Sequence, residues 1–168
     1  MIFLTIGSHE PFDRLVRAVD DWAAAHPGVE IFGQIARVGD AGYRPVHFAW
    51  QEIIGPQDYR ARCAGAELII AHAGMGSIIT AMELSRPVVI MPRRGHLRET
   101  RNDHQWATAM RFAAKPGIFV AADESELASA IDRARANDGR ISEVSRFADS
   151  SLTDAIRGVI FATPVQQA

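Results

Sequence analysis

The sequence predicts an α/β domain built on a Rossmann-like, mainly parallel sheet that is flanked by helices. Over residues 1–136, short apolar segments alternate with segments whose apolar residues recur at helical spacing. Turns rich in glycine and proline separate these segments. One apolar segment leads directly into a glycine-rich turn and a helix-forming stretch. This alternation is typical of parallel strands joined by right-handed helical crossovers.

Each element of the first half has a local reason. Residues 2–6 form an apolar run and are expected to be a buried strand, and the apolar spacing in 12–25 predicts a helix that ends at a Pro-Gly pair. Further strands are expected at 29–35 and, with a weaker pattern, at 46–50. The next helix, 56–64, begins at a proline, a residue favoured at the first helical position.

The second half predicts strands and helices in strict alternation, at 68–71, 75–84, 88–91, 102–114, 117–120 and 124–136. Asp123 suits the N-cap of the last helix. Ligands of such sheets bind at the carboxyl ends of the strands, so the loops at 7–11, 72–77 and 92–105 should converge on one cleft.

Residues 137–168 are expected to form a C-terminal helical tail, separate from the 1–136 domain. Its apolar residues recur at helical spacing, at Val144, Phe147, Ala148, Leu152, Ile156 and Ile160. Two interpretations stay open here. The tail is either a terminal helix packed on the domain or a segment that docks on another chain.

Composition narrows the function classes. The chain has 168 residues, 48% of them hydrophobic, which suits one domain with a sizeable core. A net charge of −2 gives no general attraction to nucleic acid, and a single cysteine, Cys63, fits a reducing cytosol. No apolar run approaches the roughly 18 residues that span a bilayer, so a membrane role is expected to be peripheral or to come through a partner.

The glycine-rich turn is the strongest functional signal. Residues 69–80, IIAHAGMGSIIT, place Gly74, Met75, Gly76 and Ser77 between an apolar strand and a helix start. Backbone N–H groups at such a start bind phosphate, and glycines let the phosphate come close. The pattern best fits a phosphorylated ligand, above all the diphosphate of a nucleotide-sugar. The alternative is a tight strand-to-helix turn without a ligand.

Polar residues at two other strand ends are candidates for the same cleft. His72 either contacts the ligand or is a hydrogen-bonded structural residue. After the first strand, Gly7 permits a close approach, and Ser8, His9 and Glu10 are polar. His9 or Glu10 could act as a general base, and a simple polar loop is the alternative.

The loop 92–105, PRRGHLRETRNDHQ, is rich in cations and polar groups. Its arginines, which include Arg93, give it a positive local field that suits a flap over an anionic ligand. Asp103, His104 and Gln105 lie where the next helix begins, and aspartate and glutamine are natural partners of sugar hydroxyls. A solvated loop is the alternative interpretation.

Several common chemistries have no motif in this sequence. Metal-site spacings such as Cys-x-x-Cys are missing, as are the P-loop and the nucleophile elbow. The first strand also lacks the Gly-x-Gly-x-x-Gly fingerprint of dinucleotide enzymes. We therefore expect neither a metal nor a cofactor.

Taken together, four stretches resemble the C-terminal, donor-binding half of family 28 glycosyltransferases, one lobe of a GT-B architecture. They are TIGSH with FDRLV, then AELIIAHAGMGS, then RPVVIMPR, then NDHQ, within residues 1–125. The chain is most similar to small stand-alone members, which act in dolichol-linked oligosaccharide or bacterial exopolysaccharide synthesis.

The resemblance implies roles for individual residues. Gly74, Gly76 and Ser77 would lie by the UDP diphosphate, and Gly7 and Ser8 would approach it from the first loop. The donor sugar would lie near a polar run at the start of a helix, namely Asn102, Asp103, His104 and Gln105.

One position departs from the family pattern. Members commonly have an acidic residue eight positions after His72, where it binds the ribose hydroxyls, and this chain has Thr80 there. Glu83, almost one helical turn later, is a candidate replacement, or ribose recognition differs.

The resemblance further implies an inverting hexosyltransferase that uses a UDP-sugar as substrate and a lipid-linked sugar as acceptor. A complete GT-B enzyme has two lobes, so a membrane-attached partner subunit would supply the acceptor lobe and recruit a cytoplasmic chain to the membrane face. His9 is the candidate base on this chain, although the partner could supply the base instead. The rival hypothesis is a nucleotide-sugar-binding or regulatory module without turnover, and a non-nucleotide enzyme is a third possibility.

Overall fold

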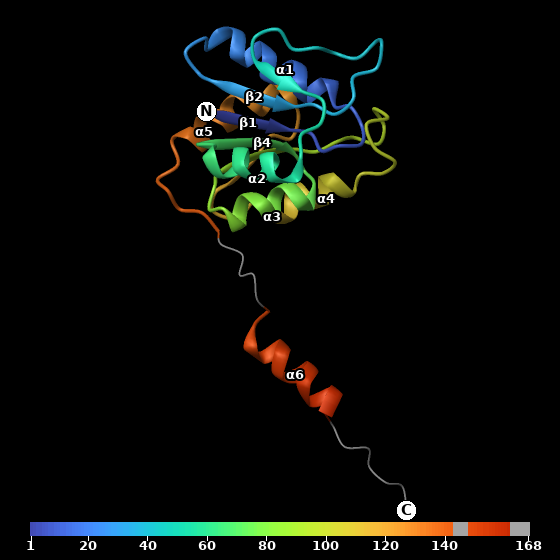
Figure 1. Cartoon of the computed structure of the whole chain (residues 1–168), viewed down its shortest axis with the longest axis vertical. Helices are drawn as coiled ribbons and strands as arrows, with labels where there is room; N and C mark the ends of the chain where they lie inside the picture. The colour runs from blue at the N-terminus through green and yellow to red at the C-terminus, as the bar shows by residue number, and fades with distance from the viewer. Residues whose placement is uncertain (143–147, 162–168) are drawn as a thin grey trace, which may run out of the picture.

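A six-stranded parallel sheet forms the centre of the computed structural model, which describes residues 1–142 and 148–161 (Figure 1). Its spatial order is β3-β2-β1-β4-β5-β6. The strands are β1 (Ile2–Thr5), β2 (Ile31–Gln34), β3 (Ala49–Gln51), β4 (Leu68–His72), β5 (Val88–Met91) and β6 (Ile118–Val120). The order reverses between β1 and β4, which pair in parallel from Ile2 with Leu68 to Thr5 with Ala71. This is the Rossmann-like arrangement that the sequence predicts.

Helices cover both faces of the sheet (Figure 1). One face packs against α1 (Asp13–Ala25) and α5 (Leu127–Arg135), which follows a short 3₁₀ turn, η1 (Glu124–Glu126). The opposite face packs against α2 (Pro56–Gly65), α3 (Met75–Glu83) and α4 (His104–Phe112). The chain therefore builds two apolar layers, one on each side of the strands.

The two layers explain why the central strands are continuously apolar. In β1, Ile2 and Leu4 belong to the core under α1, whereas Phe3 belongs to the core under α3. All three side chains are fully buried. Burying one such side chain contributes about 1.5–3 kcal/mol, so the inner strands stabilise both layers at once.

The third strand lies further along the chain than the sequence predicts, at Ala49–Gln51 instead of 46–50. The cause is the buried carboxylate of Asp20 on α1. It accepts hydrogen bonds from the backbone N–H groups of Val46 (3.1 Å) and His47 (2.8 Å) and from the Tyr43 hydroxyl (2.6 Å). Because Asp20 takes these amides, residues 43–47 belong to a loop anchored on α1, and Val46 is 77% exposed.

The start of the tail contacts the domain, since the Ser142 amide donates to the Pro116 carbonyl at 2.8 Å, but its helix does not. Helix α6 (Ser150–Phe161) has no buried residue, and Figure 1 shows it standing away from the sheet. The interpretation of a terminal helix packed on the domain is therefore wrong for α6. Val144 and Phe147 lie outside the described residues. The docking interpretation stays a prediction.

We predict that Asp20→Asn lowers the free energy of unfolding by about 2–3 kcal/mol, because hydrogen bonds to a charged group contribute that much each and an amide cannot accept all of them. Burial tends to raise the pKa of Asp20, but the hydrogen bonds outweigh it and hold the pKa below its usual value. The stability that Asp20 adds is thus present above the unfolded-state pKa of about 3.9 and is lost as the pH falls through the folded-state value.

Urea unfolding at neutral pH measures this effect. The matched control is Asp21→Asn, since Asp21 is the exposed neighbour on the same helix. Equal loss in both variants would show that the Asp20 anchor contributes nothing specific.

Candidate functional site

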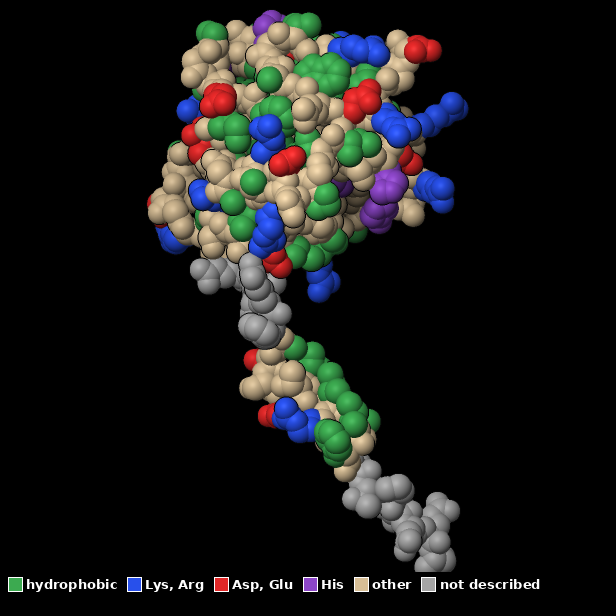
Figure 2. Space-filling view, viewed as in Figure 1, with side chains coloured by type: hydrophobic (Ala, Val, Ile, Leu, Met, Phe, Trp, Pro, Cys, Tyr) green, Lys and Arg blue, Asp and Glu red, His purple; other side chains and the backbone are tan. Residues whose placement is uncertain are grey.

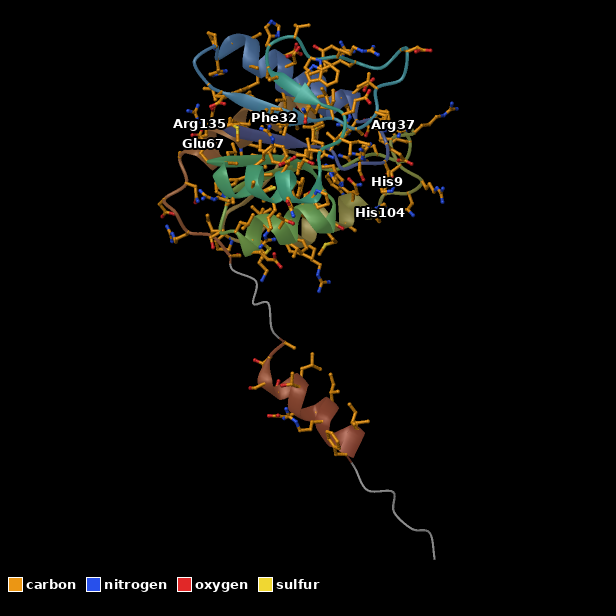
Figure 3. The ribbon with its side chains drawn as sticks, in the orientation of Figure 1. His9, Phe32, Arg37, Glu67, His104 and Arg135 are labelled. Atoms are coloured by element: carbon orange, nitrogen blue, oxygen red, sulfur yellow. The ribbon has the colours of Figure 1, made fainter. Side chains whose placement is uncertain are left out.

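The candidate site lies where the strand order reverses. The chain leaves β1 towards α1 on one face and leaves β4 towards α3 on the other, which opens a crevice at the carboxyl ends of the strands. A cavity of about 630 Å³, the switch-point cavity, occupies it. It is lined by Thr5, Gly7, Ser8, His9, Gln34, Ile54, Pro56, Tyr59, His72, Gly76, Ser77 and Thr80. Figure 3 shows His9 at this end of the domain and Glu67 at the opposite end.

The first turn of α3 has free backbone donors, and Gly76 and Ser77 of that turn line this cavity. Gly74 is the N-cap residue, and no side chain caps the helix. Within the described part of the chain, the amides of Met75, Gly76 and Ser77 have no hydrogen-bond acceptor, whereas the Ile78 amide donates to the Gly74 carbonyl. A Cβ built on Gly76 meets nothing within 4 Å. The turn is therefore open to an anion, as a helix N-terminus without a cap should be.

The imidazole of His72 is wedged between two glycines. A Cβ on Gly74 would overlap the ring, and a Cβ on Gly7 would lie 3.2 Å from its Cε1 atom. Gly7 also has φ +81°, which side chains rarely adopt. From the sequence, we expected these glycines to let a phosphate come close. In the structure, both of them accommodate His72.

His72 is held neutral. Burial, followed by the nearby charge of Arg93, lowers its pKa to about 4. Its Nδ1 atom is buried and has no hydrogen-bond partner among the described residues.

Sequence analysis missed three polar residues of the cavity. Thr5 donates from Oγ1 to Gln34 Oε1 (3.3 Å), and Gln34 Nε2 donates to the Gly7 carbonyl (3.4 Å), which fixes the first loop. Tyr59 on α2 donates to Ser77 Oγ at 3.5 Å, and burial raises the pKa of Tyr59 to about 12. Thr5 and Gln34 could have been found as polar ends of buried strands. Tyr59 gave no signal, because only tertiary packing turns α2 towards the cavity.

The ribose candidates separate in the structure. Thr80 lines the switch-point cavity. Glu83 is not among its lining residues and instead accepts a hydrogen bond from Arg60 Nη1 at 3.2 Å. Among the residues that the structure describes, no carboxylate lines the switch-point cavity beside Thr80.

Arg93 holds loops together. Its guanidinium is buried over the Phe12 ring, with 4.6 Å to the centroid. It donates to the carbonyls of Ile6 (3.0 Å), Glu10 (2.7 Å), Pro11 (2.5 Å) and Glu99 (3.3 Å). These four hydrogen bonds occupy most of its donors, so the loop after β5 is tied to the loop after β1.

Of the polar run at the start of α4, Gln105 lines a small cavity of about 160 Å³ beside His9, and residues 102–104 do not line it. Gln105 is buried, and its Oε1 accepts from the Arg93 amide at 3.2 Å. Asn102 accepts a hydrogen bond from the His104 amide (3.1 Å), and Asp103 accepts one from the Gly95 amide (2.8 Å). All three residues from Asn102 to His104 are exposed, and Figure 3 shows His104 near His9 in this view.

His9 lies between two cavities. It lines the switch-point cavity and a smaller one of about 160 Å³, the inner cavity, which also contacts His72, Arg93 and Gln105. The Nδ1 atom of His9 is 3.1 Å from Ser8 Oγ. This contact leaves Nε2 available to a substrate.

The described ranges contain neither a candidate metal site nor a candidate membrane-spanning helix. Residues 1–142 and 148–161 contain no group of three or more His, Cys, Asp or Glu side chains that could hold a metal ion. In the same ranges, no helix has the length and apolar character needed to cross a bilayer.

We predict that Gly74→Ala lowers the free energy of unfolding by about 1–3 kcal/mol, because the new methyl group overpacks against His72. Gly76→Ala is the matched control: its methyl group enters open space and should cost no stability. Thermal and urea unfolding compare them. Equal effects of the two changes would contradict the packing described for His72.

We predict a pH dependence from the same residue. The folded-state pKa of His72 is about 4, below the ordinary value of about 6.5, so the unfolded chain binds this proton first. The stability that His72 adds is fully present above about pH 6.5 and is lost as the pH falls towards 4. An NMR titration of the His72 Cε1 proton reads the folded-state value directly. Titration near 6.5 would refute the burial argument.

Comparisons with known proteins agree with this fold. The model of the glycosyltransferase family 28 C-terminal domain matches residues 1–157. None of the curated proteins compared with the chain matches it significantly. Many solved structures do match.

Three solved structures illustrate the fold. The glycotransferase of kitacinnamycin has 20% identity and a TM-score of 0.61 over 94% of this chain, which spans 37% of that protein. The solution structure of ALG13 has 16% identity and a TM-score of 0.54, with 92% of this chain and 93% of ALG13 covered. The UDP-GlcNAc 2-epimerase of Methanocaldococcus jannaschii, solved with UDP-GlcNAc and UDP, has 13% identity and a TM-score of 0.57 over 96% of this chain and 45% of the epimerase.

At these identities the three structures establish the Rossmann-like fold alone. The family rests on the sequence model, which covers nearly the whole chain. The chain therefore belongs to glycosyltransferase family 28, as a C-terminal domain of that family.

Proposed function

We propose that this chain is the donor-binding, catalytic subunit of an inverting glycosyltransferase that moves a hexose from a UDP-sugar to a lipid-linked acceptor. The observation that supports this most is the group of three free amides, Met75, Gly76 and Ser77, of which Gly76 and Ser77 line a cavity of about 630 Å³. That volume lies within the range of small-molecule sites. A family 28 domain with open amides at the switch point has the features of a nucleotide diphosphate site.

In the proposed reaction, these amides stabilise the negative charge of the leaving group. The acceptor hydroxyl oxygen attacks C1 of the donor sugar from the face opposite the diphosphate, and the bond between C1 and the diphosphate oxygen breaks. UDP leaves with the bonding electrons, and the amides of α3 stabilise the charge on its phosphates. The proton of the acceptor hydroxyl passes to a base, for which His9 Nε2 is our candidate.

The acceptor lobe is proposed to come from a membrane-attached partner polypeptide. The described residues form one Rossmann-like lobe, and a GT-B enzyme has two. Helix α6 offers a docking surface, because its apolar side chains are exposed: Leu152, Ile156, Val159, Ile160 and Phe161. Docking of this face would recruit the chain to the cytoplasmic side of the membrane, in polysaccharide or glycolipid synthesis.

A second candidate function is a nucleotide-sugar-binding or regulatory module without turnover. The ribose position favours it, since Thr80 replaces the usual carboxylate and Glu83 is paired with Arg60. Binding and transfer experiments separate the two proposals.

We predict that Gly76→Asp weakens UDP binding by about tenfold or more, since a carboxylate at this open position repels phosphate at close range. Calorimetry with UDP measures the affinity. Gly28→Asp is the matched control, because Gly28 is an exposed glycine whose added Cβ also meets nothing within 4 Å. UDP binding that is equal in both variants, or missing from the unaltered chain, would overturn the proposal.

We predict that His9→Gln lowers sugar transfer by about 10²–10⁴-fold in the presence of the partner, while UDP affinity stays unchanged, because the loss of a general base affects the chemical step. Transfer to a lipid-linked acceptor is measured with and without the partner. Binding without transfer under every pairing would favour the regulatory module. Transfer by the isolated chain would contradict the need for a second lobe.

A further inference from the structure

A third cavity continues the crevice beyond the inner cavity. This outer cavity measures about 630 Å³ and lies between the loop after β1 and the loop after β5. The inner and outer cavities share Glu10 and Thr100, and the inner and switch-point cavities share Gly7, Ser8, His9 and His72. The three cavities are therefore neighbours at the carboxyl edge of the sheet, with His9 in the lining of the first two and Glu10 in the lining of the last two.

The loop that forms the outer wall is fixed by its own side chains. Glu99 accepts two hydrogen bonds from the Arg14 guanidinium, at 2.7 and 2.8 Å, and one from the Arg94 amide at 2.8 Å. Asp103 accepts from the Gly95 amide. The Arg94 guanidinium donates to the Ala122 carbonyl (2.9 Å) and lies over the Trp106 ring. The wall is preorganised before any ligand arrives.

Two arginines of this wall differ from the others. Arg98 and Arg101 are exposed and line the outer cavity. Among residues 1–142 and 148–161, neither guanidinium has a carboxylate or carbonyl partner, in contrast to Arg14, Arg93 and Arg94. Arg98 has φ +58°, a left-handed conformation that is unfavourable for a non-glycine residue, and its amide donates to the Gly95 carbonyl at 2.9 Å.

The outer cavity is also lined by three carboxylates. Glu99 is paired with Arg14, and Asp13 is half-buried and accepts a hydrogen bond from the Tyr43 amide at 3.1 Å. Among the described residues, neither Asp13 nor the exposed Glu10 forms an ion pair with Arg98 or Arg101, so both guanidiniums are available to a ligand. Guanidinium groups in this setting recognise planar or tetrahedral oxyanions through paired hydrogen bonds.

We propose that Arg98 and Arg101 form an anion subsite, which binds an anionic group of the substrate beyond the UDP diphosphate. This inference rests on the proposed function, because it takes the orientation of the donor from the α3 site. The recognised chemistry is an oxyanion. Its source is either a carboxylate on the donor sugar or a phosphate of the acceptor.

Calorimetry on the full chain tests the subsite in two arms. The donor arm compares UDP-glucuronate with UDP-glucose. The acceptor arm adds geranyl diphosphate or geraniol to the chain saturated with UDP. In at least one arm the anionic probe should bind about tenfold more tightly than its neutral counterpart, which is the size of one charge-assisted hydrogen bond.

The double variant Arg98→Gln/Arg101→Gln should remove that preference and leave UDP affinity unchanged. The control pair Arg44→Gln/Arg111→Gln removes two exposed arginines that line none of the three cavities, and it should retain the preference. A preference in the donor arm assigns the anion to the sugar, and one in the acceptor arm assigns it to the acceptor.

Two results overturn the subsite. If UDP binds normally and no anionic probe is preferred, or if the preference survives in the double variant, the inference fails while the proposed function stands. If UDP itself does not bind, both fail.

Discussion

The crevice depends on one packing constraint, the His72 imidazole held between Gly7 and Gly74. These glycines belong to the loops that leave the two central strands, so a single side chain sets the distance between the loops. A bulkier residue at either glycine would push the loops apart or displace the ring. With the loops in place, α3 begins without a side-chain cap, its first three amides have no acceptor among the described residues, and Gly76 and Ser77 line the cavity. The binding capacity of the site is thus a consequence of core packing.

Arginines fix the loops at the same edge of the sheet. Arg14, Arg93 and Arg94 are used inside the protein, where they bind carbonyl groups and Glu99. They join the loops after β1 and β5 into one wall, whereas Arg98 and Arg101 remain exposed on it. Figure 2 shows cationic side chains and His side chains projecting from the right side of the domain in this view, with some acidic side chains among them. Arginines are thus gathered at this edge although the overall charge is −2.

Much of the fold could be predicted because the inner strands are apolar on both faces. The strand Val88–Met91 lies where the sequence predicts it, and α1 begins one residue later than expected. The prediction was weaker wherever distant contacts decide the structure. The amides of residues 46 and 47 donate hydrogen bonds to the Asp20 carboxylate and do not join β3. The local sequence around residues 46 and 47 does not predict this contact.

For the candidate site, too, some residues could be predicted from the sequence and others could not. The glycine turn, His72 and the first loop could be placed from strand ends alone, and the structure brings them together around one cavity. The roles of Arg93 and Glu83 could not be read from the sequence, because each depends on a partner far along the chain. Tyr59 was missed for the same reason.

The proposed function depends most directly on the binding of a diphosphate by the amide hydrogens of α3. An ¹⁵N-resolved NMR titration of the full chain with UDP observes these groups individually. We predict that, on addition of UDP, the amide signals of Met75, Gly76 and Ser77 shift most strongly and saturate together, while those of α6 stay unchanged. Shifts that are confined to other parts of the chain, with these three amides unaffected at saturation, would contradict it.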